Sequence, residues 1–271
     1  MSFLQAILLG VVQGLTEFIP VSSTAHLLIA QRLLGLPASD AMFSFLVLVQ
    51  WGTLIALFAY YWRDFWNILL ALLKIRRGTP FLPDAKLGLY ILLATVPALA
   101  AGYLLKDAVK ALFTAPLLEA GIRLLTAAAL LALAEWLGRR ARALEGMTGL
   151  DALLIGLFQA VAVFPGASRS GVTISGGMLR GFDRPAAARF AFLMSAPVLL
   201  AAGAYQTLDV LKMPGLIDFI PSLEFGMAAS AVVGWLAIRW LVAYLNRHSL
   251  WVFSAYCALI GTACLAAYFW L

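Results

Sequence analysis

The sequence predicts an all-α polytopic membrane protein, with six transmembrane helices and two re-entrant helical hairpins arranged as an inverted-topology repeat. Of its 271 residues, 63% are hydrophobic and only 12% are charged, whereas soluble domains carry about 25% charged residues. The apolar residues form long uninterrupted runs, and roughly 20 such residues cross a hydrocarbon core about 30 Å thick as a helix. Two further apolar stretches are broken by proline, glycine and hydroxyl residues, and these two stretches resemble each other.

The unbroken runs are the predicted transmembrane helices. Aromatic residues at several of their ends, such as Tyr60, Trp62 and Trp270, are typical of interfacial belts. The broken stretches, 2–34 and 151–180, are predicted to be re-entrant, because irregular backbone at membrane depth is tolerated only where protein or a watery cavity covers it. The six spans are expected at 43–61, 87–105, 117–137, 187–207, 223–244 and 250–270.

The two broken stretches indicate an internal duplication. The segments A-I-L-L-G and A-L-L-I-G match, and in the same register Gln13 falls on Gln159 and Ser22 on Ser168. Each half then contains one broken stretch followed by three spans, a pattern typical of repeat membrane proteins. We therefore expect a single integral membrane domain over 1–271, with repeat halves at about 1–140 and 150–271.

Basic residues predict the orientation, if each hairpin returns to its starting side and each long run crosses once. One side then holds twelve of them, namely Arg63, Lys74, Arg76, Arg77, Lys86, Arg139, Arg140, Arg142, Arg180, Arg184, Arg189 and Arg247. The other side holds four, namely Arg32, Lys106, Lys110 and Lys212. The positive-inside rule places the richer side in the cytoplasm and both termini outside. The two broken tips then meet near the middle of the bilayer, and the net charge of +6 reflects topology rather than a nucleic-acid partner.

The first broken stretch contains a dense group of polar residues. Gln13 and Glu17 are four residues apart and share one helix face. A proline ends that helix, and the hydroxyl residues that follow stand where a new helix begins, with backbone N–H groups that suit phosphate. These hydroxyl residues are Ser22, Ser23 and Thr24.

A capping role accounts equally well for Ser22 or Thr24, because hydroxyl side chains are common N-caps. Glu17 is different, since an apolar run has no structural need of a carboxylate and an ionisable group at membrane depth indicates function. If Ser23 lies in the first turn of its helix, His26 comes onto the same face three residues later.

The second broken stretch reads P-G-A-S-R-S-G-V-T. Arg169 offers a planar fork of donors suited to phosphate oxygens, and Gly166 allows close backbone approach. Further hydroxyls come from Ser168, Ser170 and Thr173. The stretch lacks the G-K-[ST] of a nucleotide-binding loop, which argues against nucleotide hydrolysis.

Other interpretations of the charged residues stay open. Arg169 could neutralise Glu17 as a buried structural pair, and such a pair that opens for a ligand is compatible with a binding role. Arg239 and Glu135 lie near the predicted cytoplasmic ends of their spans, from where their charged groups can reach the interface. Arg123 lies near the outer end of the span that contains Glu135, where its role is undecided.

The two polar motifs resemble those of a known family. Gln13-x-x-x-Glu17 followed by P-V-S-S-T-A-H, with P-G-A-S-R-S-x-x-T in the second half, is similar to the undecaprenyl-diphosphate phosphatase family linked to bacitracin resistance. That family is described by [E/Q]-x-x-x-E and P-G-x-S-R-S-x-x-T motifs, and both are complete here. Gln13 is the permitted variant of a position where glutamate is common, so an ionised group is not essential there. Ala25 stands where glycine is frequent before the histidine.

The resemblance implies hydrolysis of undecaprenyl diphosphate to undecaprenyl phosphate and inorganic phosphate, which recycles the lipid carrier for cell-wall glycan synthesis. It implies a multi-pass protein of the inner (plasma) membrane with its active site facing the outer side. The expected catalytic residues are Glu17, Ser23, His26 and Arg169. The expected substrate-binding residues are Gln13, Ser22, Thr24, Gly166, Ser168, Ser170 and Thr173.

Phosphoryl transfer depends mainly on positioning and charge neutralisation. Ser23 is the expected nucleophile, with His26 as its general base or as acid to the leaving group. Water as nucleophile, with Ser23 as a phosphate ligand, is the alternative. Glu17 would bind a divalent cation, Mg²⁺ or Ca²⁺, or orient His26 or water. No organic cofactor or nucleic acid is expected; the partners are a polyprenyl diphosphate lipid and the membrane, and a homodimer is left open.

The alternative function is that of a transporter or flippase of undecaprenyl phosphate. Inverted repeats with broken helices at the bilayer midplane are also what a transporter shows. A structural membrane scaffold is a third option, but it leaves Glu17 and Arg169 unexplained.

Overall fold

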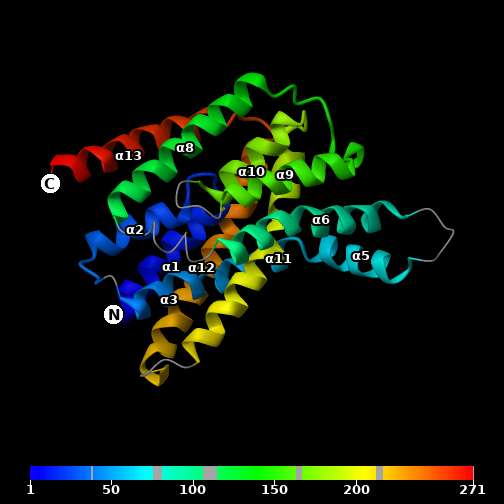
Figure 1. Ribbon diagram of the computed structural model, residues 1–271. Coiled ribbons are helices and arrows are strands. Elements are labelled where there is room, and N and C mark those ends of the chain that lie inside the picture. Colours follow the sequence, from blue (N-terminus) through cyan, green and yellow to red (C-terminus); the bar gives the residue numbers. More distant parts are fainter. Residues whose placement is uncertain (38, 76–80, 106–114, 163–166, 212–215, 271) are drawn as a thin grey trace.

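The computed structural model describes residues 1–37, 39–75, 81–105, 115–162, 167–211 and 216–270. Within these ranges the chain is helical apart from its connections, one 3₁₀ turn (Leu144–Gly146) and an isolated bridge between Arg142 and Phe182. The helices assemble into one bundle, and both termini lie at the left of Figure 1. The protein is therefore an all-α polytopic membrane protein, as the sequence predicts.

Six helical segments of the described ranges are long and apolar enough to cross a membrane, which confirms the predicted spans to within a few residues. The first of them, Asp40–Tyr60, is divided at Val49 into two consecutive helices. The helices are α3 (Asp40–Leu48), α4 (Gln50–Tyr60), α6 (Pro83–Leu104), α8 (Pro116–Leu137), α11 (Arg184–Val210), α12 (Leu216–Leu245) and α13 (Trp251–Trp270).

Each of the two broken stretches forms a pair of short helices that pack on each other, as a hairpin requires. The first pair is α1 (Phe3–Phe18) and α2 (Ser23–Leu33), and the second is α9 (Gly149–Val161) and α10 (Arg169–Leu179). Helix α1 ends just before Pro20, which has no N–H to continue it. The opposite membrane orientation of the two halves stays a prediction.

One helix was not predicted. Helix α5 (Trp62–Leu73) is amphipathic and carries two charged residues in its first turn, so it has no long apolar run. Arg63 lies over the ring of Trp62, and Asp64 pairs with Arg189 of α11. The helix packs along α6 at the right of the bundle, away from both hairpins (Figure 1).

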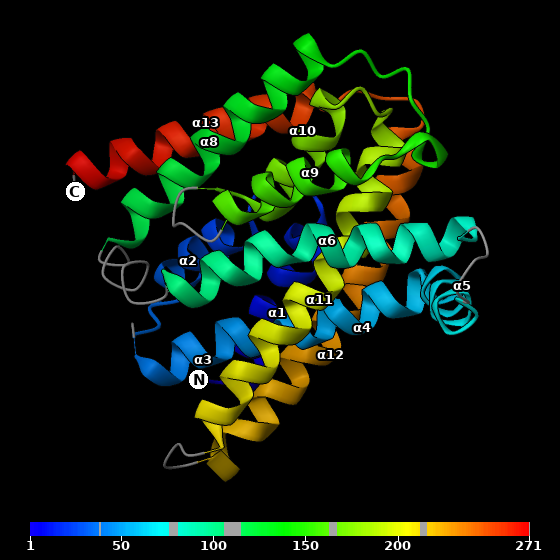
Figure 2. The same ribbon diagram turned by 45° about the vertical axis from the view of Figure 1, so that its right-hand side comes forward.

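The first helix of each hairpin packs against a span from the other half of the chain. Helix α1 packs along α12 of the second half, and α9 packs along α6 of the first half. The third spans of the two halves, α8 and α13, run side by side in both views (Figures 1 and 2). Such reciprocal contacts accord with an internal duplication.

Equivalent glycines of the two hairpins make these contacts between the halves close. A Cβ added at Gly10 of α1 would lie 2.2 Å from the carbonyl oxygen of Gly226 in α12. A Cβ added at Gly156 of α9 would lie 2.5 Å from the carbonyl oxygen of Ala94 in α6. Small residues let helix backbones approach each other in lipid, where packing rather than the hydrophobic effect holds helices together.

Glu135 of α8 has its carboxylate buried and paired within the protein rather than extended into solvent, unlike what the sequence suggested. Its side chain is fully buried and accepts hydrogen bonds from Arg140 and Arg184, each at 2.6 Å, and from the backbone N–H of Leu250 at 2.7 Å. Buried charges in proteins are paired in this way because desolvation of an unpaired charge is costly. Glu135 thereby joins α8 to the starts of α11 and α13.

We expect Gly10→Ala to lower the free energy of unfolding by about 1–3 kcal/mol, because the added methyl group meets backbone and one helix must move. Thermal unfolding of the purified protein in detergent measures this change. Gly102→Ala of α6 is the matched control, since among the described residues no heavy atom outside its own stretch of helix lies within 4 Å of its added Cβ. Equal melting temperatures for the two variants would contradict the close contact between α1 and α12.

Candidate active site

The tips of the two hairpins meet, as predicted. Arg169, the first residue of α10, forms an ion pair with Glu17 of α1. Next to it, the Ser170 hydroxyl donates a hydrogen bond to the carbonyl oxygen of Ile19 at 3.3 Å. The polar residues of two stretches about 150 positions apart in the sequence therefore form one site.

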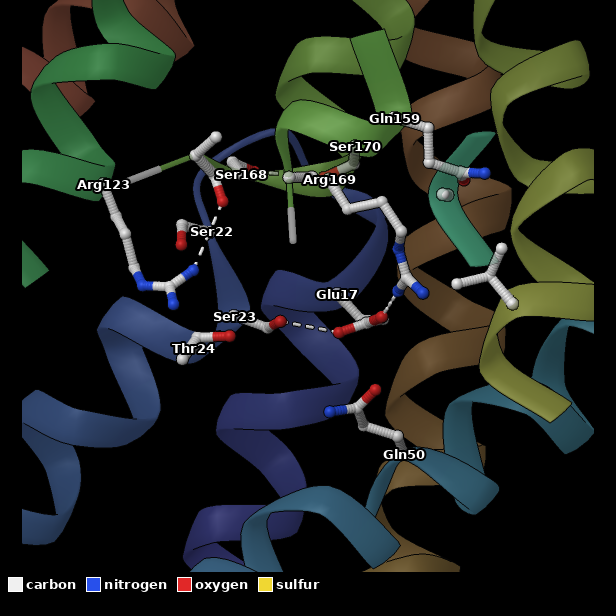
Figure 3. Close-up of a pocket in the computed structure, with 14 residues that line it drawn as sticks. Glu17, Ser22, Ser23, Thr24, Gln50, Arg123, Gln159, Ser168, Arg169 and Ser170 are labelled. Atoms are coloured by element: carbon white, nitrogen blue, oxygen red, sulfur yellow. Dashed lines mark hydrogen bonds and ion pairs between the residues drawn. The ribbon is translucent and has the colours of Figure 1, made fainter. Parts of the chain in front are cut away.

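Glu17 is the centre of this site. The amide of Gln13 donates to its Oε2 at 2.8 Å, which confirms that the two residues share one helix face. The hydroxyl of Ser23 donates to the same oxygen at 2.6 Å, and Arg169 faces the other oxygen (Figure 3). Glu17 is only 4% exposed, so these donors replace the water that an exposed carboxylate would bind.

The turn between α1 and α2 holds Ser22 in an uncommon backbone conformation. The backbone φ of Ser22 is 67°, and residues other than glycine rarely adopt a positive φ. Its side chain caps α2 by accepting from the N–H of Ala25, although at 3.5 Å the bond is long. The capping role considered for Ser22 is thus present, and the same residue also lines the cavity described below.

His26 stabilises this turn. Its Nδ1 lies 2.9 Å from the Ser22 carbonyl oxygen, which can only accept, so Nδ1 carries the hydrogen. In the neutral ring Nε2 then accepts from the Tyr256 hydroxyl at 2.8 Å, and the two rings stack with planes 9° apart. Both nitrogens of His26 have these partners, and the Ser23 hydroxyl bonds to Glu17 instead.

The tip of the second hairpin is built on Ser168 and Ser170. The Ser168 hydroxyl caps α10 by accepting from the N–H of Gly171 at 3.3 Å. Thr173 donates to the carbonyl oxygen of Arg169, one turn earlier in the same helix. Gly166, predicted to bind substrate, lies outside the described residues.

A cavity of about 210 Å³ lies between the two tips (Figure 3). Residues from both hairpins and from α4, α6, α8 and α11 line it. Most of the predicted site residues are on its wall, namely Glu17, Ser22, Ser23, Thr24, Ser168, Arg169 and Ser170.

Three predicted residues lie beside this cavity rather than on its wall. Gln13 supports Glu17 from within α1, and His26 supports the turn at Ser22. Thr173 lines a small adjoining hollow together with Glu17 and Arg169. These side chains are placed to hold the residues that line the cavity.

The cavity also contains three polar residues that were not predicted to belong to it: Gln50, Arg123 and Gln159. Arg123 is 5% exposed and donates to the carbonyl oxygen of Ala167 at 3.3 Å. The sequence contained a signal for two of them. An arginine within an apolar span indicates function, and Gln159 matches Gln13 in the predicted repeat. Gln50, at the start of α4, gave no comparable signal.

The site is suited to an anion with many oxygen atoms. Arginine binds phosphate through several parallel N–H groups, and the surrounding hydroxyls can donate to the remaining oxygens. The cavity is enclosed by apolar spans, so an anionic group attached to a lipid tail could reach it from the membrane.

Comparison with known proteins places this chain among membrane phosphatases. The family model for the bacitracin resistance protein BacA matches residues 6–263. A protein named undecaprenyl-diphosphatase from Anaeromyxobacter dehalogenans (strain 2CP-1 / ATCC BAA-258) is 44% identical over 271 residues, covering 97% of this chain and 90% of the relative. Proteins of the same name from Desulforudis audaxviator (strain MP104C) and Chlorobium phaeovibrioides (strain DSM 265 / 1930) are each 42% identical. The match to the Desulforudis protein covers 95% of this chain and 94% of the relative. The match to the Chlorobium protein covers 96% of this chain and 95% of the relative.

We expect Glu17→Gln to lower the free energy of unfolding by about 3–5 kcal/mol, because it leaves the Arg169 guanidinium without its carboxylate. The double variant Glu17→Gln/Arg169→Gln should recover part of this loss, since it removes both charges of the pair. Melting temperatures in detergent give the comparison. A double variant that loses the full sum of the two single losses would show that the two charges do not interact.

Proposed function

We infer the function of this chain from one premise: it belongs to the bacitracin resistance protein BacA family, which the match over residues 6–263 and the relatives named undecaprenyl-diphosphatase establish. The protein is an undecaprenyl-diphosphatase, a membrane hydrolase that converts undecaprenyl diphosphate to undecaprenyl phosphate and inorganic phosphate. The structural observation that carries this conclusion is the cavity between the hairpins, which combines Glu17, Arg169 and several hydroxyls inside an apolar bundle. The reaction recycles the lipid carrier for cell-wall synthesis, which fits the family's link to bacitracin resistance.

The Glu17–Arg169 pair supports a mode of substrate binding. The isoprenyl tail stays among the spans and in lipid, while the diphosphate enters the cavity. There Arg169 exchanges part of its contact with Glu17 for phosphate oxygens, and the hydroxyls of Ser168 and Ser170 and the backbone N–H groups of the two tips supply further donors. Charge neutralisation of this kind supplies most of the catalysis in phosphoryl transfer.

Ser23 is the nucleophile in the proposed mechanism. Its Oγ attacks the terminal phosphorus, the hydrogen passes to a base, and the bond from phosphorus to the bridging oxygen breaks to release the lipid monophosphate. Water then cleaves the phosphoserine and releases inorganic phosphate. The contact of 2.6 Å between the Ser23 hydroxyl and Glu17 supports Glu17 as the first acceptor of that hydrogen.

His26 serves as general acid or base when its ring exchanges one of its present partners, Ser22 or Tyr256, for a reacting oxygen. In the geometry described above it orients the turn that carries Ser23. Water as nucleophile, with Ser23 binding phosphate, is the alternative mechanism.

A divalent cation, Mg²⁺ or Ca²⁺, fits this site as a companion of the substrate. Glu17 is the one carboxylate among the described residues that line the cavity, and the described ranges contain no group of three or more His, Cys, Asp or Glu placed to hold a metal. Mg²⁺ commonly uses one or two carboxylates together with substrate phosphates, so Glu17 and the diphosphate would hold it jointly. The cation would then neutralise charge on the phosphate oxygens.

We place the protein in the inner (plasma) membrane with the cavity open to the outer side. The asymmetry of basic residues supports the placement of both termini outside, and the first hairpin then enters from the outer side. The homodimer stays a prediction.

Arg169→Ala and Glu17→Ala should each lower phosphate release from undecaprenyl diphosphate by about 10²–10³-fold, because each removes a charge that the transferring phosphate needs. The measurement is phosphate release by the purified protein in detergent. Arg239→Gln, in α12 over the Trp235 ring and away from the cavity, is the control and should keep the parent rate. Parent-like rates for both variants would show that these two charges do not serve the reaction, whereas a parent protein that releases no phosphate would refute the hydrolase and leave the transporter.

Ser23→Ala should lower turnover at least about a thousandfold, as expected when a nucleophile is removed from a group of residues that act together. Rapid acid quenching of the parent during turnover, followed by mass spectrometry, should detect phosphate on Ser23. Thr262→Ala removes a hydroxyl of α13 that donates to the carbonyl oxygen of Ala258 in the same helix, and this variant should turn over normally. Full turnover by Ser23→Ala would establish direct attack by water.

A further inference from the structure

Two arginines lie on opposite sides of the cavity. Figure 3 shows Arg123 of α8 at one side and Arg169 of α10 toward the other, with Ser22 and Ser23 between them. Both arginines are fixed by the second hairpin, because Arg169 belongs to its tip and Arg123 donates to the carbonyl oxygen of Ala167 two residues earlier. The roles derived above use only Arg169.

Arg123 has the chemistry of a second anion site. Its side chain is almost fully buried on the cavity wall. Glu119, one turn earlier on α8, is its acidic neighbour, just as Glu17 is the acidic neighbour of Arg169. A guanidinium has five N–H donors in a planar fork, so Arg123 can keep its bond to Ala167 and also bind phosphate oxygens.

Gln159 of α9 lies on the side of the cavity opposite Arg123 (Figure 3). It is 1% exposed, and in the described part of the chain neither its amide nitrogen nor its amide oxygen has a hydrogen-bond partner. Buried polar groups are nearly always hydrogen-bonded. An unpaired amide on a cavity wall therefore indicates that the bound ligand supplies the missing partner.

The proposed reaction, on which this inference rests, gives the two sides different roles. The phosphorus that Ser23 attacks must lie next to Ser23 and hence near Arg169, since Glu17 contacts both residues. The second phosphate of the substrate is attached through one bridging oxygen and extends away from that point. It needs a cation of its own, and Arg123 is the second arginine among the described lining residues.

We propose that Arg123 binds the phosphate that stays on the lipid, whereas Arg169 and Gln159 bind the terminal phosphate that is transferred. The cavity then holds the diphosphate lengthwise and in one direction only. After the bond to the bridging oxygen breaks, the lipid monophosphate remains at Arg123 and inorganic phosphate leaves from the side of Gln159. The two products therefore inhibit the enzyme through different residues.

Product inhibition of purified full-length protein tests this assignment, with undecaprenyl diphosphate as substrate and with undecaprenyl phosphate and inorganic phosphate as inhibitors. In Arg123→Gln, the inhibition constant of undecaprenyl phosphate should rise roughly 10- to 100-fold, as expected for loss of a charged hydrogen bond, while that of inorganic phosphate is unchanged. In Gln159→Leu, the inhibition constant of inorganic phosphate should rise about 3- to 10-fold, and the inhibition constant of undecaprenyl phosphate should stay the same.

Arg123→Lys keeps the charge and should recover part of the binding of undecaprenyl phosphate. Gln206→Leu removes a glutamine that bonds to Ser44 away from the cavity, and it should change neither constant. A parent protein that releases no phosphate would overturn the proposed function and this inference with it. An active parent in which Arg123→Gln weakens both inhibitors equally, or weakens neither, would overturn the inference alone.

Discussion

The ion pair between Glu17 and Arg169 is the interaction on which the rest of the structure depends. It joins the two hairpins where α1 ends and α10 begins. A single charge buried in an apolar bundle is costly, so neither tip could carry its ionised group alone. The pair lets both tips be polar and makes the site depend on the correct assembly of the two halves. A ligand that carries negative charge can then bind Arg169 in place of part of the contact with Glu17.

That pair requires the hairpins to sit at a fixed depth, which packing provides. Gly10 and Gly156 let the first helix of each hairpin lie directly against a span of the other half. Near the C-terminal end of α8, Glu135 joins that helix to the starts of α11 and α13. The spans therefore form a rigid frame for irregular backbone, the condition under which such backbone is tolerated in a membrane. The strained conformation of Ser22, held by His26, belongs to the same frame.

The fold could largely be predicted because long apolar runs and their breaks are properties of local sequence. The spans and the two broken stretches follow from hydropathy and from proline and glycine, and the motif residues follow from their polarity at membrane depth. Helix α5 was missed because its apolar residues recur at helical spacing along one face and do not form one long apolar run. The partners of His26 could not be foreseen, since Tyr256 is brought beside it by tertiary packing between distant helices. Arg123 and Gln159 reach the cavity for the same reason, although each was visible as a polar residue in an apolar stretch.

In the predicted repeat, matching positions of the two hairpins carry different residues, and these residues lie on two different sides of one cavity. Gln13 and Gln159 occupy equivalent positions, yet only Gln13 has a carboxylate one turn later, because Val163 stands in the second copy where Glu17 stands in the first. The amide of Gln13 is therefore bonded to Glu17, whereas the amide of Gln159 has no partner among the described residues and lines the cavity. In the same register Arg169 replaces Ser23. In the proposed mechanism the second hairpin, with a cation in place of a hydroxyl, is the phosphate-binding side, while the first hairpin carries the carboxylate and the hydroxyl that contacts it. A substrate with two unlike ends fits a site whose two sides differ in this way.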